Sequence, residues 1–221
     1  MDTLLRRRSM IASGGSTPPS PTPQPEFHSR LVFDGLAQIQ TDIIPQTDWS
    51  MRVSVGGETR QAVQGIFSAR KNGDAVVGMW FNSSSNSSKR VLAARYFSTT
   101  TDSDHPQKND YTTRLGLFLT PYRFGYDNTV YSIASNGEAP DAGIMMGAEA
   151  GGYNYTGKLG WFYIYGADAK NATNNADLRD NYTPIYTLRP CTLDGEAGYW
   201  CVETSHFYGN TAGQGTLSVE D

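Results

Sequence analysis

Two tyrosines in a glycine-rich segment are the residues whose types and spacing best fit ligand binding. The segment reads Gly151-Gly152-Tyr153-Asn154-Tyr155-Thr156-Gly157. Alternate residues of an extended chain project to the same side, so the two rings would lie together. Tyrosine, asparagine and glycine are also the residue types that adaptable binding loops use. The pattern predicts a glycan-binding site at Tyr153, Asn154 and Tyr155, and a core position or a subunit contact for the tyrosines is the alternative.

Other aromatic side chains could offer the same flat surface to the C–H face of a sugar. They are Trp49, Trp80, Trp161, Tyr122 and Tyr126. Trp80 and Trp161 lie inside apolar runs that resemble strands, so we expect both of them to be core residues. This expectation leaves the tyrosine pair as the favoured site.

Catalysis on a saccharide generally requires two carboxylates that face one cleft. Glu196 and Glu203 are seven residues apart, and Glu149 has no carboxylate close by in the sequence. The chain contains no Glu-x-Asp-x-x-Glu run and no Gly-x-Ser-x-Gly nucleophile elbow. We therefore predict no catalytic residues, and a hydrolase or lyase is the least favoured class of function.

The histidines do not indicate a metal site. His28, His105 and His206 each stand apart from any other histidine or cysteine at the spacing that metal ligands show. A Gly-rich phosphate loop is also missing, because the glycines around Ile144 lack the lysine of that motif. We predict structural roles for the histidines and no resident cofactor.

A basic cluster near the start of the chain suits attachment to another protein. Arg6, Arg7 and Arg8 are flanked by apolar side chains on both sides, namely Leu4, Leu5, Met10 and Ile11. Apolar anchors around a charged centre fit a peptide that lies in a protein groove. One arginine triplet neutralises too few phosphates for strong nucleic-acid binding. We predict that residues 1–12 form an anchoring arm, and a disordered tail is the alternative.

The chain divides into an arm, a linker and a body. Five of the eleven prolines lie between Pro18 and Pro25, which predicts a semi-rigid linker over residues 13–27. The body is expected to span residues 28–221, a length that one core can serve. Residues 1–30 carry four basic and two acidic side chains, whereas the remainder carries 14 basic and 20 acidic ones. A basic arm on an acidic body suggests that the two parts meet different partners.

Targeting signals are not evident. Only Met10, Ile11 and Ala12 follow the basic start, which is too short an apolar run for a secretion signal. No apolar run is long enough to insert into a membrane. Cys191 and Cys201 could form a cross-strand disulfide on a hairpin, but without an export route two reduced, half-buried thiols are favoured.

The elements of the body are expected to be almost entirely strands. Short runs rich in β-branched and aromatic residues occur at 52–55, 76–81, 91–97, 115–119, 130–133, 161–165 and 198–202. Asn72-Gly73 predicts a hairpin turn, and residues 115–119 predict a central strand buried on both faces. One helical turn is expected at 176–180. The pattern predicts an all-β fold, a two-sheet antiparallel sandwich.

Several segments resemble the concanavalin A-like jelly roll, in particular laminin-G-like (LamG) domains. The segments are LVFDG at 31–35, GIFSAR at 65–70, KLGWFYIY at 158–165, RPC at 189–191, DGEAGYWC at 194–201 and FYGN at 207–210. The resemblance implies a jelly-roll sandwich over roughly residues 31–218. It also implies a loop-bound calcium ion, for which residues 101–104 and 168–180 offer oxygen ligands. It does not imply one activity, because this fold hosts lectins, enzymes and structural modules.

The arm and linker resemble the start of virion fibre proteins of tailed phages, including the crAss-like group. This resemblance implies a structural protein of the virion surface, a head fibre or capsid decoration, made in the host cytoplasm. Its arm would bind a capsid or other virion protein, and its lectin-like body would face outward, bind surface glycans and assemble as a homotrimer. A tail fibre or a cellular carbohydrate-binding module is the alternative.

Overall fold

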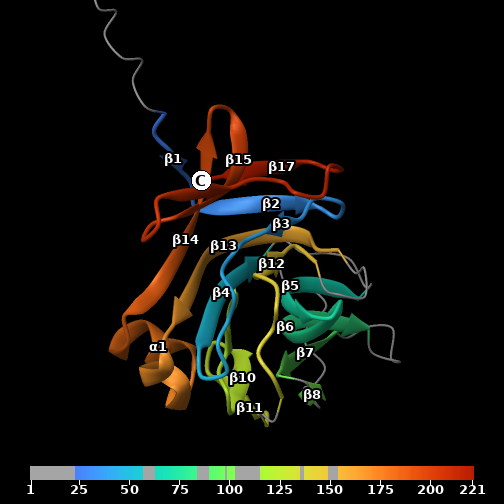
Figure 1. Ribbon diagram of the computed structural model, residues 1–221, viewed down its shortest axis with the longest axis vertical. Helices are drawn as coiled ribbons and strands as arrows, with labels where there is room; N and C mark the ends of the chain where they lie inside the picture. The colour runs from blue at the N-terminus through green and yellow to red at the C-terminus, as the bar shows by residue number, and fades with distance from the viewer. Residues whose placement is uncertain are drawn as a thin grey trace, which may run out of the picture.

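The computed structural model describes residues 23–56, 63–83, 90–97, 99–102, 115–134, 137–148 and 154–221. These residues form two antiparallel β-sheets packed face to face, with two short helices beside one of them (Figure 1). The predicted all-β fold, a two-sheet antiparallel sandwich, is confirmed. The arm (1–12) and residues 13–22 of the linker lie outside the described residues.

The larger sheet contains eleven of the described strands. Its main path runs through β11 (Thr129–Ser132), β10 (Arg123–Tyr126), β9 (Leu115–Leu119), β4 (Ser50–Gly56), β13 (Thr156–Tyr165), β14 (Pro184–Leu193), β15 (Glu196–Cys201) and β16 (His206–Tyr208). Strand β2 (Arg30–Asp34) pairs with β13 and with β17 (Leu217–Glu220), and β1 (Glu26–Phe27) pairs with β14. The long strand β13 therefore joins the two parts of this sheet.

The smaller sheet contains six described strands. They run in the order β3 (Ile39–Gln40), β12 (Met145–Met146), β5 (Gln64–Lys71), β6 (Asp74–Ser83), β7 (Arg90–Tyr96) and β8 (Thr99–Asp102). The turn between β5 and β6 has Asn72 at φ 52° and Gly73 at φ 91°. These left-handed values at both central residues are those of the predicted hairpin turn.

The main core lies between the sheets and follows from alternation along each strand. In β4, Met51, Val53 and Val55 are buried toward the smaller sheet, whereas Arg52 and Ser54 point outward. Across the gap, the rings of Phe67 and Phe162 meet edge to face, with centroids 5.0 Å apart. The outward side chains of β4 and β13 are therefore available for function.

Strand β9 is buried on both faces, as predicted. Leu117 and Leu119 belong to the main core. Phe118, on the opposite face, packs with Leu178 and Tyr165 in a second cluster. This cluster seats the 3₁₀ helix η1 (Ala167–Asn171) and the helix α1 (Asn175–Asn181) on the outer face of the larger sheet.

Helix α1 includes the predicted turn at 176–180 and extends it by one residue at each end. The Asn174 side chain caps the helix by accepting a hydrogen bond of 2.9 Å from the backbone N–H of Asp177. The preceding helix η1 was not predicted, because its sequence carries no helical period. Among the described residues, no helix is long and apolar enough to cross a membrane.

The body begins two residues earlier than predicted. Glu26 pairs with Thr192 and Phe27 pairs with Cys191, so the last two residues assigned to the linker form strand β1. His28 continues this attachment through its Nδ1, which lies 2.8 Å from the Asp221 carboxylate at the other end of the chain. The two ends of the body therefore meet on one side of the sandwich (Figure 1).

The two cysteines are not bonded to each other. Cys191 lies opposite Gly198 and Cys201 lies opposite Leu188, so they are offset along the β14–β15 pair rather than facing each other. Both thiols are free and fully buried. The disulfide alternative is wrong because of this register, and the expectation of half-buried thiols is wrong because both side chains are fully buried.

Candidate functional site

The predicted tyrosine pair does not form an exposed platform. Tyr155 is completely buried, packs edge to face on Phe33 and belongs to the main core. Its backbone N–H also donates to the Gly147 carbonyl at 2.8 Å, which holds this segment against the smaller sheet. The glycan-binding role predicted for Tyr155 is therefore wrong, because its side chain points into the core and leaves no ring surface for a ligand.

The other two predicted residues have different outcomes. Asn154 is half-buried, and its side-chain carbonyl accepts a hydrogen bond of 2.7 Å from the Gln38 amide. This bond commits Asn154 to joining two loops. Tyr153 lies outside the described residues, so its predicted role stays a prediction.

Trp161 is not a core residue, contrary to expectation. In β13, Phe162 and Ile164 point into the core, so Trp161 and Tyr163 point to the outer face, where both are half-buried. The two rings lie beside each other with centroids 5.9 Å apart. Trp80, by contrast, is buried as expected.

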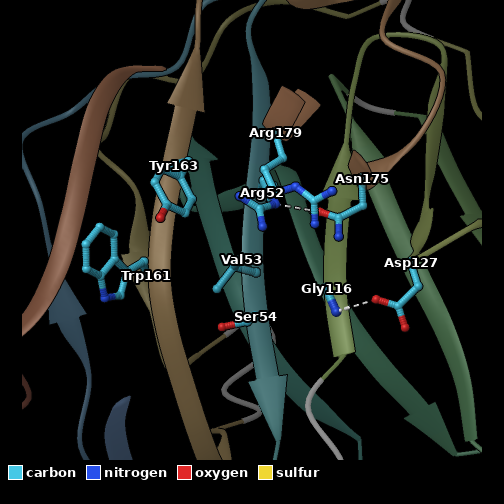
Figure 2. Close-up of a pocket in the computed structure, with 9 residues that line it drawn as sticks. All are labelled: Arg52, Val53, Ser54, Gly116, Asp127, Trp161, Tyr163, Asn175 and Arg179. Atoms are coloured by element: carbon cyan, nitrogen blue, oxygen red, sulfur yellow. Dashed lines mark hydrogen bonds between the residues drawn. The ribbon is translucent and has the colours of Figure 1, made fainter. Parts of the chain in front are cut away.

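A pocket of about 290 Å³ lies on this outer face, beside helix α1. Figure 2 shows Trp161 and Tyr163 on β13 at one side, β4 in the middle, and Gly116, Asp127 and Asn175 at the other. Its lining residues are Arg52, Val53, Ser54, Gly116, Asp127, Trp161, Tyr163, Asn175 and Arg179. This volume is at the low end of the range typical of small-ligand sites, about 300–1,000 Å³.

The glycine at position 116 lets helix α1 approach the sheet. A Cβ atom on Gly116 would lie 2.2 Å from the Asn175 amide nitrogen, well inside van der Waals contact. The Gly116 N–H donates to the Asp127 carboxylate at 2.9 Å. Gly116 thus allows Asn175 and Asp127 to form one wall of the pocket.

Arg52 is the most firmly held cation of the pocket. Its Nε donates to the Asn175 side-chain carbonyl at 2.7 Å, and its guanidinium carbon lies 5.0 Å from the Tyr163 ring centroid. The Tyr165 hydroxyl also hydrogen-bonds to Arg52. Burial raises the pKa of Tyr165, and the hydrogen bond from Arg52 opposes part of that rise. Three side chains therefore fix the guanidinium at the pocket.

Arg179 comes from the last turn of α1. It pairs with the neighbouring Asp180 through two hydrogen bonds of 2.6 and 2.9 Å, and both side chains are more than half exposed. This contact lowers the pKa of Asp180, and the charge of Arg52 lowers it further. Arg52 is thus close enough to share the electrostatic environment of the Arg179–Asp180 pair.

The aromatic wall continues beyond the pocket. The guanidinium of Arg189, on β14, lies 4.2 Å from the Trp161 ring centroid and 3.8 Å from the Phe27 ring centroid. Such stacked contacts are favourable and restrict both partners. The strand β1 at the end of the linker is therefore in physical contact with the wall of the pocket.

The glutamates considered for catalysis do not come together in the described residues. The Glu203 carboxylate accepts a hydrogen bond of 2.7 Å from the Thr187 N–H, a structural contact at the end of β15. Glu196 is exposed at the start of β15. Glu149 lies outside the described residues. In the pocket, Asp127 is the one carboxylate among the described lining residues.

The two described histidines have structural contacts, as predicted. His28 lies between Asp221 and Thr192, and His206 packs on the ring of Tyr208. His105 lies outside the described residues.

Two carboxylates of the segment 168–180, from which the resemblance implies calcium ligands, already have protein partners. Asp177 accepts from Thr173 and Asn181, and Asp180 is paired with Arg179. Within the described ranges, no three His, Cys, Asp or Glu side chains gather as metal ligands do. The other segment, 101–104, lies partly outside the described residues.

The pocket residues gave only a partial signal in the sequence. Trp161 and Tyr163 alternate, which is the same pattern that singled out Tyr153 and Tyr155. Because both residues lie in an apolar run, the sequence predicted a core position for Trp161 and not the outward orientation that the structure shows for both. Arg52, Asn175 and Arg179 are brought together only by the sheet order and the seat of α1, which no local pattern contains.

Comparison with known proteins identifies the fold. No protein-family model and no curated protein sequence matches this chain. The structure is similar to a heptameric SAP-like pentraxin from Limulus polyphemus, with a TM-score of 0.52 and 8% identity, over 78% of this chain and 94% of that one. The similarity at this identity concerns the fold alone. Together with the two sheets described above, it shows that the body is a concanavalin A-like jelly roll.

Proposed function

We propose that this protein is a non-enzymatic display protein whose jelly-roll body binds glycans at the outer-face pocket. The observation that carries the proposal is the composition of that pocket. Trp161 and Tyr163 supply aromatic surface, and Arg52, Asp127 and Asn175 supply hydrogen-bonding groups opposite them. Apolar sugar faces and ring hydroxyls need this combination of partners.

The carboxylates support binding rather than catalysis. Hydrolysis of a glycosidic bond generally uses two carboxyl groups on either side of the bond. Among the described lining residues Asp127 alone has one, and its Oδ1 already accepts from the Gly116 N–H. In this position the Asp127 carboxylate can accept a hydrogen bond from a sugar hydroxyl.

A glycan array with the full chain tests the binding proposal. Tyr163→Ala should remove binding, and thermal melting checks that the variant stays folded, because Tyr163 lies outside the main core but packs against the second cluster. Tyr122→Ala is the matched control, since Tyr122 is 48% exposed and does not line the pocket. Failure of the unaltered protein to bind any glycan would contradict the proposal.

The proposed binding does not use calcium. Its charged groups are two guanidinium groups and one carboxylate, and a hard cation prefers several oxygen ligands without positive charges beside them. Glycan binding should therefore be equal in EDTA and in millimolar calcium. A requirement for calcium would move the site to another part of the molecule, such as residues 101–104.

The N-terminal arm extends the proposal to the virion surface. The arm binds a capsid or other virion protein through Leu4, Leu5, Arg6, Arg7, Arg8, Met10 and Ile11, and the body faces outward from the capsid as a head fibre or decoration. Support comes from the charge contrast between arm and body and from the proline-rich linker. The linker joins the body at β1, above α1 on the same side of the view (Figure 1).

Mass spectrometry of purified phage particles tests the virion role. Tens to hundreds of copies per particle would support capsid attachment, and a few copies would favour a tail fibre. Deletion of residues 1–12 should abolish incorporation and leave a folded body. Particles that still incorporate the shortened chain would contradict the anchor, and absence from all particles would favour a cellular binding module.

The assembly proposed for the display protein is a homotrimer. Closed cyclic symmetry is the rule for soluble homo-oligomers, and the pentraxin with the similar fold is a heptamer. Native mass spectrometry of the full chain should show three copies. A monomer in that measurement would contradict the trimer and leave the pocket, which one chain forms, unaffected.

A further inference from the structure

We propose that the outer-face pocket selects acidic saccharides, and that Arg52 and Arg179 bind the carboxylate of a uronic-acid-type sugar. The inference rests on the proposed function and specifies its ligand class. It starts from the charges of the pocket. Two guanidinium groups and one carboxylate, that of Asp127, belong to the described lining, in a body that is acidic as a whole. A neutral sugar would not require two such groups.

Arg52 presents a prepared fork for an anion. An arginine has five N–H donors, and those of Arg52 that the structure assigns go to Asn175 and Tyr165. The remaining donors lie on a guanidinium that its contact with Tyr163 already restrains. Planar, doubly hydrogen-bonded contact is the arrangement that arginine makes with carboxylates, so a planar anion fits this group well.

Arg179 can bind the same ligand carboxylate as Arg52, because little free energy is lost when it leaves its present partner. Its partner Asp180 is an exposed neighbour, and exposed ion pairs of this kind are weak. Arg52 and Arg179 both line the pocket, so a ligand carboxylate placed between the two guanidinium groups can accept hydrogen bonds from each of them.

The remaining lining suits the rest of an acidic sugar. Asp127 lies beside Gly116, at the far side of the pocket from Trp161 and Tyr163, and would repel a carboxylate bound near Gly116 (Figure 2). The negative group is therefore directed toward Arg52 and Arg179, while ring hydroxyls donate to Asp127. The C–H face of the ring then meets Trp161 and Tyr163. This division of the pocket fixes the orientation of the sugar.

Binding of two matched oligosaccharides tests the inference. The probes are a hexamer of galacturonic acid and the same hexamer after reduction of its carboxyl groups, measured by titration calorimetry with the full chain. The acidic hexamer should bind about tenfold or more tightly, because hydrogen bonds to charged groups add substantially to affinity. The preference should weaken with added salt.

Variants assign the preference to the pocket. Arg179→Gln changes an exposed side chain and should bring the two affinities close together without unfolding the protein. Arg52→Gln should do the same, and its folding is checked by thermal melting because Arg52 is half-buried. Lys170→Gln is the matched control, since it removes an exposed positive charge of the nearby helix η1 that does not line the pocket. The control should keep the preference.

The outcomes separate the inference from the proposed function. Equal affinity for both hexamers, lost in Tyr163→Ala, would overturn the acidic preference and leave glycan binding at this pocket intact. A preference that survives both arginine substitutions would overturn the assignment to Arg52 and Arg179. No binding of either hexamer or of any glycan on the array would overturn the proposed function itself.

Discussion

Phe27 lies directly against Arg189, with 3.8 Å between the ring centroid and the guanidinium carbon. Phe27 belongs to β1, where the linker ends, and the same guanidinium carbon lies 4.2 Å from the Trp161 ring centroid. A segment that sequence composition assigned to the linker thus supports the aromatic wall of the pocket. The attachment of the body and the geometry of its proposed ligand site are physically connected through this stack.

Phe27→Ala should weaken glycan binding severalfold while changing the stability of the fold little. Removing the ring frees Arg189 and leaves Trp161 less restrained, and cation–π contacts at exposed sites contribute about 0.5–1 kcal/mol. Titration of the full chain with the ligand identified on the array measures the effect. Ile185→Ala is the matched control, because Ile185 is 37% exposed against 38% for Phe27 and is outside the stack. Equal affinity in both variants would show that the stack does not support the pocket.

Gly116→Ala should destabilise the protein by about 1–3 kcal/mol, the usual range for an overpacked site. The new methyl group would overlap the Asn175 amide, so the Asn175 side chain or the helix that carries it must shift. Arg52 would then lose its hydrogen bond to Asn175, and ligand affinity should fall as well. Urea unfolding measures the first effect and calorimetric titration the second.

Gly166→Ala provides the control for that prediction. A Cβ at Gly166 would meet its nearest atoms at 3.4 and 3.5 Å, which is ordinary contact, and its φ of −76° suits alanine. This variant should unfold at nearly the same urea concentration as the unaltered protein. If Gly116→Ala also unfolded at the urea concentration of the unaltered protein, the close approach of α1 at Gly116 would not matter for stability.

Much of this architecture could be predicted from sequence, because its signals are local. The turn at Asn72-Gly73, the doubly buried strand β9 and the short helix α1 all follow from patterns within a few residues. The proposed site depended on something else. Trp161 faces outward only because Phe162 and Ile164 are fixed inward by their pairing with β4 and β14. Tyr155 faces inward for a similar long-range reason, its contact with Phe33 on β2.

The arginines show the same limit. Arg52 and Asn175 are 123 residues apart in sequence and meet through one hydrogen bond. This contact forms only because β4 pairs with β9 and because α1 packs on Phe118. Local composition contains neither fact, so the site emerges only from the assembled sheet.

The Cys191 thiol should make the fold less stable at high pH. Burial raises its pKa from 9.0 to about 11. The folded state therefore keeps the thiol proton over a range in which the unfolded chain has lost it. Its contribution to stability is complete below pH 9 and is lost as the pH rises from 9 to 11. Urea unfolding at pH 8 and at pH 10.5 measures the loss.

Cys191→Ala isolates that contribution. The buried tyrosines also make the folded state less stable at high pH, because burial raises the pKa of Tyr199 and Tyr96. The variant should keep their part of the decline and lack the part of the thiol, so its stability should fall less steeply between the two pH values. An identical decline in both proteins would mean that the thiol titrates normally. A thiol reagent should label neither buried cysteine before the protein unfolds.

Leu178→Ala should reduce both stability and glycan binding. Leu178 is fully buried in the second cluster, where it holds α1 against Phe118. Its truncation should cost about 2–5 kcal/mol, as buried leucine truncations do. The loosened helix carries Asn175 and Arg179, so the pocket should lose its helical wall. Leu92→Ala is the matched control, since Leu92 is equally buried but belongs to β7 in the smaller sheet. That variant should lose stability and, while folded, keep its affinity, which calorimetry below both melting temperatures would measure. If both variants kept full affinity, α1 would not form part of the binding site.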